Sequence, residues 1–187
     1  MTGRREHGFV ILAVGLALTG AACHGTRNKV TTQDEGASGS AAVSRTAPGK
    51  PALVRMNDAK ASAQLLSGFY AIENNAWRWT AGKFSVLLYT PPTGAQSGAT
   101  LTLTFTIPDA AARELEPVTL TASIDDMALQ SARYDKAGSY TFGADVPPSM
   151  LTTDSVKVDF ALDKSFRMSG DVRELGIIAA SIGLTGK

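Results

Sequence analysis

The sequence has few of the side chains that most often carry catalysis or bind zinc. It contains one cysteine and two histidines in 187 residues. Cys23, His7 and His24 all precede the region where a folded domain is expected. A domain without imidazole or thiol lacks Ser-His-Asp and Cys-His catalysis and the N and S ligands of zinc. We therefore expect a non-catalytic domain with no metal site and no cofactor.

Paired carboxylates are the remaining route to catalysis, because glycoside hydrolysis requires two acids. The candidate acids are Glu73, Asp163, Asp171 and Glu174. A small domain built from short strands offers little room for a deep cleft, so we expect that the protein is not an enzyme. Asp125-Asp126 is more typical of a hairpin turn than of a calcium-ligand pair.

The sequence also lacks an excess of either charge. It has 18 basic and 17 acidic residues, and 16 of each remain once residues 1–22 are removed. Nucleic-acid binding normally requires lysines and arginines clustered on one face. The scattered charges of this chain therefore predict that it does not bind nucleic acid.

The longest apolar run, Phe9 to Leu18, follows Arg4 and Arg5 and ends in small residues. It is far shorter than the ~20 residues of a membrane-spanning helix, and the pattern is typical of a secretory signal over residues 1–22. Gly20-Ala21-Ala22-Cys23 resembles the bacterial lipoprotein signal, with Gly20 where Leu is commonest. This resemblance predicts a lipid on Cys23 that anchors the protein in the membrane of the cell envelope. Cleavage by an ordinary signal peptidase is the alternative, and it would give a soluble secreted protein.

Residues 23–51 are rich in small and polar residues and contain no aromatic side chain. Such a composition cannot bury enough apolar surface to offset the loss of chain entropy on folding. We therefore expect a signal helix over 1–22, a disordered tether over 23–51 and one folded domain over 52–187.

Within the domain, the alternation of apolar and polar residues predicts strands that are exposed on one face. The clearest alternating segments are Leu101–Ile107, Val118–Ile124 and Val156–Leu162. Weaker strands are predicted at Gly68–Ile72, Trp77–Thr80, Phe84–Tyr89, Ala128–Arg133, Tyr140–Val146 and Gly176–Ile182. Eight or nine short strands separated by turns predict an all-β fold, a single antiparallel β-sandwich or jelly roll.

The most distinctive side chains lie at the two ends of the domain: Tyr70, Glu73, Trp77 and Trp79 near its start, and Asp171 and Arg173 near its end. In a strand, Trp77 and Trp79 share one face and Arg78 points to the other. The indoles either pack in the core, with Arg78 in solvent, or stack on a sugar. Glu73 and Arg173 either form a structural ion pair or contact a ligand, and we expect the structural pair.

These two segments resemble the small galactose-binding-like β-sandwich domains that are attached to bacterial glycosyltransferases and surface-polysaccharide proteins. The resemblance rests on Glu73 with Trp77-Arg78-Trp79-Thr80, and on Asp171-Val172-Arg173-Glu174-Leu175-Gly176. It implies an accessory role in glycan biology, although no transferase domain is present in this sequence. Together with the signal, it predicts a non-catalytic envelope lipoprotein that binds glycan. The alternative is a structural domain, or one that contacts an envelope protein, with no sugar ligand.

Overall fold

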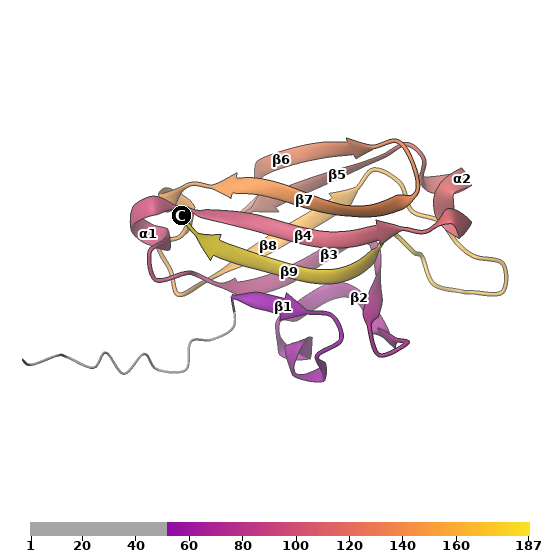
Figure 1. Ribbon diagram of the computed structural model, residues 1–187, viewed down its shortest axis with the longest axis horizontal. Helices are drawn as coiled ribbons and strands as arrows, with labels where there is room; N and C mark the ends of the chain where they lie inside the picture. The colour runs from indigo at the N-terminus through magenta and orange to yellow at the C-terminus, as the bar shows by residue number, and fades with distance from the viewer. Residues whose placement is uncertain (1–51) are drawn as a thin grey trace, which may run out of the picture. The chain divides into compact units, whose positions relative to one another are not determined.

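A computed structural model describes residues 52–187 (Figure 1). The predicted signal, the lipidation of Cys23 and the tether over 23–51 lie outside the described residues. No helix within 52–187 has the length and hydropathy of a membrane span.

The described residues form nine strands with short helical turns between them. The strands are β1 (Leu53–Arg55), β2 (Leu65–Glu73), β3 (Trp77–Tyr89), β4 (Ala99–Ile107), β5 (Val118–Ile124), β6 (Met127–Tyr134), β7 (Gly138–Val146), β8 (Ser155–Leu162) and β9 (Ile178–Gly186). The helical turns are η1 (Ala59–Ala63), α1 (Gly94–Ser97), η2 (Asp109–Ala111), α2 (Ala112–Leu115) and η3 (Pro148–Met150). All strand pairs are antiparallel, so the predicted all-β fold is confirmed.

The strands form one nearly closed sheet that folds into two layers. The path of hydrogen-bonded neighbours is β6-β5-β8-β3-β9-β4-β7, with β1 on β9 and β2 on β3. Figure 1 looks onto the layer of β7, β4 and β9, with β5 and β8 behind it. At the open corner β6 packs against β7, and the rings of Tyr134 and Tyr140 are 4.7 Å apart.

Strand β3 belongs to both layers, because it changes partners along its length. Arg78 and Trp79 pair with β9, whereas Lys83 to Tyr89 pair with β8. The sequence predicted two separate strands here, interrupted at residues 81–83. The structure has one strand, because both halves keep β2 as their neighbour on the other side.

The core is made by the apolar halves of the alternating strands. Along β5, Val118, Leu120, Ala122 and Ile124 are buried while the residues between them are partly exposed. The rings of Phe84 and Phe160, which are cross-strand neighbours on β3 and β8, stack with centroids 5.0 Å apart, and Phe142 of β7 packs edge-on against Phe160 from the other layer at 6.4 Å. The buried aliphatic and aromatic side chains form one contiguous cluster, which accounts for the stability of a domain without disulfides.

One local prediction concerns the turn between β5 and β6. Asp125 and Asp126 both have positive φ and join β5 to β6, with Ile124 opposite Met127. The predicted hairpin turn is therefore confirmed.

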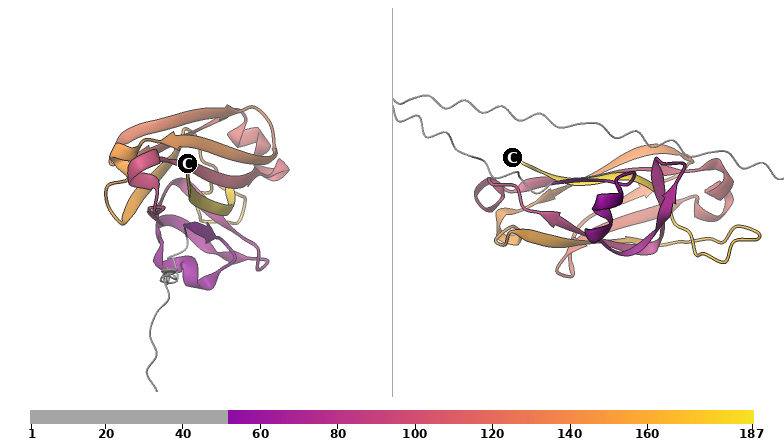
Figure 2. Two further views of the ribbon diagram at one scale, coloured as in Figure 1. Left: turned by 60° about the vertical axis from the view of Figure 1, so that its left-hand side comes forward. Right: turned by 90° about the horizontal axis from the view of Figure 1, so that it is seen from below.

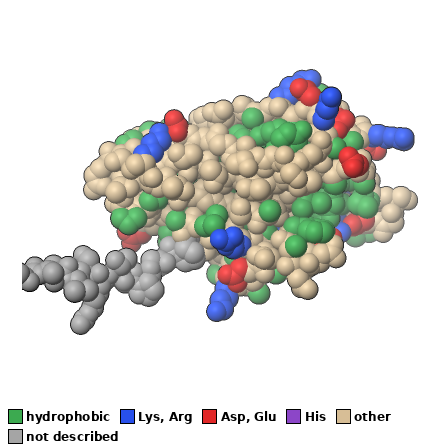
Figure 3. Space-filling model, viewed as in Figure 1, with side chains coloured by type: hydrophobic (Ala, Val, Ile, Leu, Met, Phe, Trp, Pro, Cys, Tyr) green, Lys and Arg blue, Asp and Glu red, His purple; other side chains and the backbone are tan. Residues whose placement is uncertain are grey.

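The elements η1, β1 and β2 lie together at one side of the domain (Figure 2). On the face drawn in Figure 3, basic and acidic side chains are interspersed.

Candidate functional site

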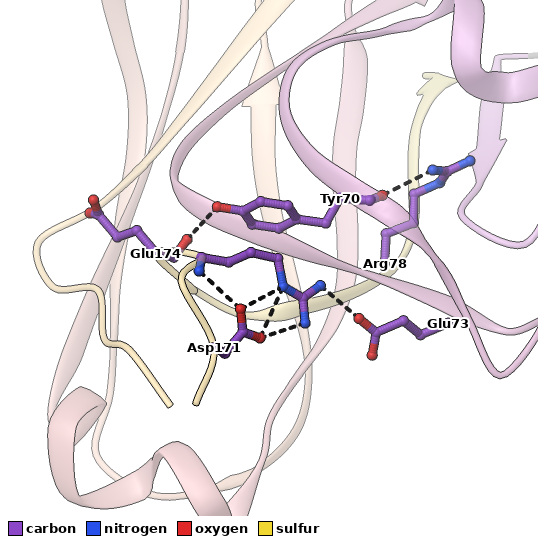
Figure 4. Close-up of polar contacts among 6 residues, drawn as sticks. Tyr70, Glu73, Arg78, Asp171 and Glu174 are labelled. Atoms are coloured by element: carbon purple, nitrogen blue, oxygen red, sulfur yellow. Dashed lines mark hydrogen bonds and ion pairs between the residues drawn. The ribbon is translucent and has the colours of Figure 1, made fainter. Parts of the chain in front are cut away.

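The two ends of the domain meet where the β2–β3 hairpin lies beside the segment between β8 and β9 (Figure 4). Arg173 donates from Nη1 to Oε1 of Glu73 at 2.8 Å, across 100 residues of sequence. The predicted pairing of these two side chains is therefore confirmed. We call the five residues Tyr70, Glu73, Asp171, Arg173 and Glu174 the arginine cluster.

Asp171 holds Arg173 in place at the centre of the arginine cluster. Its carboxylate accepts from Nε at 3.0 Å and from Nη2 at 2.7 Å, and it also accepts from the backbone N–H of Arg173 at 2.9 Å. The hydrogen bonds from the Arg173 side chain hold the pKa of the Asp171 carboxyl below its usual value. The hydrogen bonds to Asp171 and then to Glu73 raise the pKa of Arg173. Asp171 and Arg173 are therefore both ionised at neutral pH.

Tyr70 is fixed at both its ring and its hydroxyl. The Arg173 guanidinium carbon lies 5.2 Å from the centroid of the ring, which is within the range of a cation–π contact. The hydroxyl donates to the backbone oxygen of Glu174 at 2.8 Å. The Glu174 carboxylate accepts in turn from the Ser165 hydroxyl. Tyr70 remains half-buried and is thus held in one orientation at the surface.

The two tryptophans have different environments. Trp79 is buried and packs edge-on against Phe166, with ring centroids 5.9 Å apart, so it has no free face for a sugar. Trp77 lies at the start of β3, opposite Glu73 of β2, and is half-buried. Its Nε1 is buried and has no acceptor among residues 52–187. Four of the six predicted ligand residues lie in one cluster: Tyr70, Glu73, Asp171 and Arg173. Trp77 is the cross-strand neighbour of Glu73 in the β2–β3 pair. Trp79 is in the core.

Arg78 contradicts the expectation that it lies in solvent. It is only 8% exposed, and its guanidinium bonds the backbone oxygens of Met56 and Tyr70 and the hydroxyl of Ser62. Alternation placed Arg78 correctly on the face opposite the tryptophans. Packing of η1 over that face buries it, and no local signal in the sequence predicts this packing.

A shallow polar hollow of about 360 Å³ adjoins the arginine cluster. Its walls include Lys83, Asp163, Lys164, Ser165 and Glu174. Within residues 52–187, no three acidic, histidine or cysteine side chains are grouped so that they could hold a metal ion. The arginine cluster and the hollow together present carboxylates, lysines, a hydroxyl and an aromatic ring at this end of the domain.

The fold and this site define the chain, as far as it is described, as an antiparallel β-sandwich domain with a charged and aromatic end. No protein-family model and no curated protein matches the sequence. Several solved structures are similar. One is an acetyl xylan esterase from the rumen bacterium Butyrivibrio proteoclasticus, at 8% identity and a TM-score of 0.40 over 72% of this chain. The match spans 32% of that esterase, about a third of its length.

Two further similar structures carry the names of carbohydrate-binding modules. The CBM22-2 xylan-binding domain of Paenibacillus barcinonensis Xyn10C is 12% identical, with a TM-score of 0.35 over 66% of this chain and 85% of that domain. A CBM4 structure is 12% identical, with a TM-score of 0.36 over 72% of this chain and 85% of that chain. With TM-scores below 0.5, these matches identify neither a ligand nor a site, and the fold class rests on the strand pairing described above.

Proposed function

We propose that the domain is a non-catalytic module of the bacterial cell envelope that binds glycan at the arginine cluster. The observation that carries the proposal is the fixed, half-exposed ring of Tyr70, which lies in the same cluster as the carboxylates of Glu73 and Glu174. Sugar sites combine aromatic rings, which contact the apolar face of the sugar, with a few polar groups that bond its hydroxyls.

Preorganisation is the physical advantage of this arrangement. The hydroxyl contact and the Arg173 guanidinium already restrict Tyr70, and Glu73 is already restrained by Arg173. A ligand that binds there orders few additional side chains, so less of the interaction free energy is lost to entropy. Trp77 is the cross-strand neighbour of Glu73, next to the turn of the β2–β3 hairpin. It supplies a second half-exposed aromatic side chain.

Replacing Trp77 with leucine should weaken glycan binding at least about tenfold, which corresponds to about 1.4 kcal/mol. Leucine keeps apolar bulk at the position but removes the aromatic face. A glycan array identifies a ligand, and calorimetry with that ligand then measures the affinity of wild type and variant. Tyr140→Leu is the matched control, because Tyr140 is a half-buried ring on β7 outside the cluster. Equal losses in both variants would contradict the proposed site.

A structural or protein-interaction domain is the second candidate. It is favoured by the buried position of Trp79 and by the use of all three Arg173 nitrogens in bonds within the protein. A folded domain that binds nothing on a broad glycan array, yet crosslinks to one envelope protein in cells, would support this candidate over glycan binding.

Membrane attachment through a lipid on Cys23 is the second element of the proposal. It rests on the sequence pattern at residues 20–23 and on the position of the only cysteine. Cys23→Ser should move the protein from the membrane fraction to the soluble fraction, because the thiol that would carry the lipid is absent. Cys23→Ala is an independent replacement that should behave identically. A wild-type protein already found in the soluble fraction would exclude the lipid anchor.

A further inference from the structure

Arg78 is a buried cation with no acidic partner in the part of the chain that the structure describes. Arg78 takes part in none of the ion pairs among residues 52–187, and its hydrogen-bond acceptors there, two backbone carbonyls and one hydroxyl, are neutral. Arginine keeps its charge at any pH at which a protein is folded. A buried charge without a counterion is costly, even where neutral oxygens surround it.

The guanidinium also has donor capacity to spare. Nε donates to Met56 O at 3.1 Å, Nη1 to Tyr70 O at 3.0 Å and Nη2 to Ser62 Oγ at 3.2 Å. Figure 4 shows the bond to the Tyr70 carbonyl. Since arginine has five N–H donors, one N–H on each terminal nitrogen has no acceptor among the described residues.

Arg78 lines a hollow of about 200 Å³ that differs from the one beside Glu174. The other walls are Ser62, Leu65, Leu66, Ser67 and Phe69. Thus the lining combines a positive charge and hydroxyls with the apolar side chains of Leu65, Leu66 and Phe69, which we call the apolar wall. Leu66 is 47% exposed, so apolar surface continues from the hollow to the outside.

We propose that this hollow binds the carboxylate of a small acid that carries an apolar body. The two spare N–H groups and the Ser62 hydroxyl match the two oxygens of a carboxylate. One negative charge neutralises the one positive charge of Arg78. The apolar wall disfavours a strongly hydrated dianion such as phosphate, and it provides a surface for a short branched hydrocarbon. This site is separate from the glycan site of the proposed function.

The test uses sodium isovalerate as the probe on the full chain, at constant ionic strength. Isovalerate should shift the Arg78 Nε–Hε resonance in a saturable way, with a dissociation constant in the millimolar range, and should raise the melting temperature. Isovaleramide, which has the same body without the charge, should do neither. Glucuronate, a hydrophilic carboxylate, should bind at least about tenfold more weakly because it gains nothing from the apolar wall.

Substitutions at Ser62 test the site without removing Arg78, whose loss would disturb the core. Ser62→Asp places a carboxylate next to Nη2 as an internal counterion. It should raise the melting temperature of the free protein by roughly 3 °C and abolish the response to isovalerate. Ser62→Asn is the neutral control of matching shape, and it should retain the response.

Three outcomes would overturn the inference. They are the absence of a saturable shift with isovalerate in the wild type, equal responses of the aspartate and asparagine variants, and equal affinity for glucuronate and isovalerate. Each can be distinguished from failure of the proposed glycan site, because Trp77→Leu leaves the hollow intact and Ser62→Asp leaves the arginine cluster intact.

Discussion

Gly68→Ala is expected to lower the free energy of unfolding by about 3–5 kcal/mol, among the largest effects of a single substitution. Gly68 has a φ of +72°, a region that residues with a Cβ adopt only at a cost. A Cβ at this position would lie 2.1 Å from the backbone oxygen of Lys83 and 2.7 Å from Cα of Phe84. Neither atom belongs to a flexible side-chain end, so β2 would have to move away from β3.

The consequence extends beyond the contact itself, because Gly68 lies at the register shift of the β2–β3 pair between Ser67 and Phe69. Gly143→Ala on β7 is the matched control: a Cβ there meets nothing within 4 Å. We expect that control to be neutral or slightly stabilising, since alanine reduces the entropy of the unfolded chain. Urea denaturation of both variants provides the comparison. A Gly68→Ala midpoint close to that of the wild type would show that β2 is not held in this register.

Arg173→Ala is expected to lower the free energy of unfolding by about 2 kcal/mol. Removing a fully buried partner of an ion pair costs roughly 3–5 kcal/mol, and we reduce that value because the Arg173 side chain is 31% exposed. The variant leaves the partly buried carboxylates of Glu73 and Asp171 without their cation, and it removes the contact on the Tyr70 ring. Val172→Ala is the neighbouring control: Val172 is 94% exposed, so its truncation should change stability by less than about 0.5 kcal/mol.

The pH dependence distinguishes loss of the ion pair from loss of packing. The pKa of Asp171 is lower in the folded protein than in the unfolded chain, so its contribution is present above about pH 4 and is lost as the pH falls through the folded-state pKa. The difference in stability between wild type and Arg173→Ala should therefore shrink on acidification. A difference that stays constant from neutral to acidic pH would show that the arginine stabilises by packing alone. A loss of glycan binding with unchanged stability would make Arg173 a ligand contact and contradict its structural role.

The strands were predictable because alternation is a local property of the chain. Val118–Ile124 coincides with β5, and Leu101–Ile107 and Val156–Leu162 lie within β4 and β8. A strand exposed on one face must alternate, wherever its partners come from. The pairing of Glu73 with Arg173 was predicted from complementary charge at the two ends of the domain, and the structure has this ion pair.

Features that depend on several distant segments could not be predicted in this way. The sequence alone determined the fold class, the hairpin at Asp125-Asp126 and the opposite directions of Arg78 and Trp79 on β3. The tertiary structure decided what covers each face: Phe166 buries Trp79, and the packing of η1, with the carbonyl of Met56, encloses Arg78. Alternation specifies the direction of a side chain but contains no information on what lies opposite it. The environment of Arg78, and with it the carboxylate site we propose, therefore appears only when segments distant in sequence pack together.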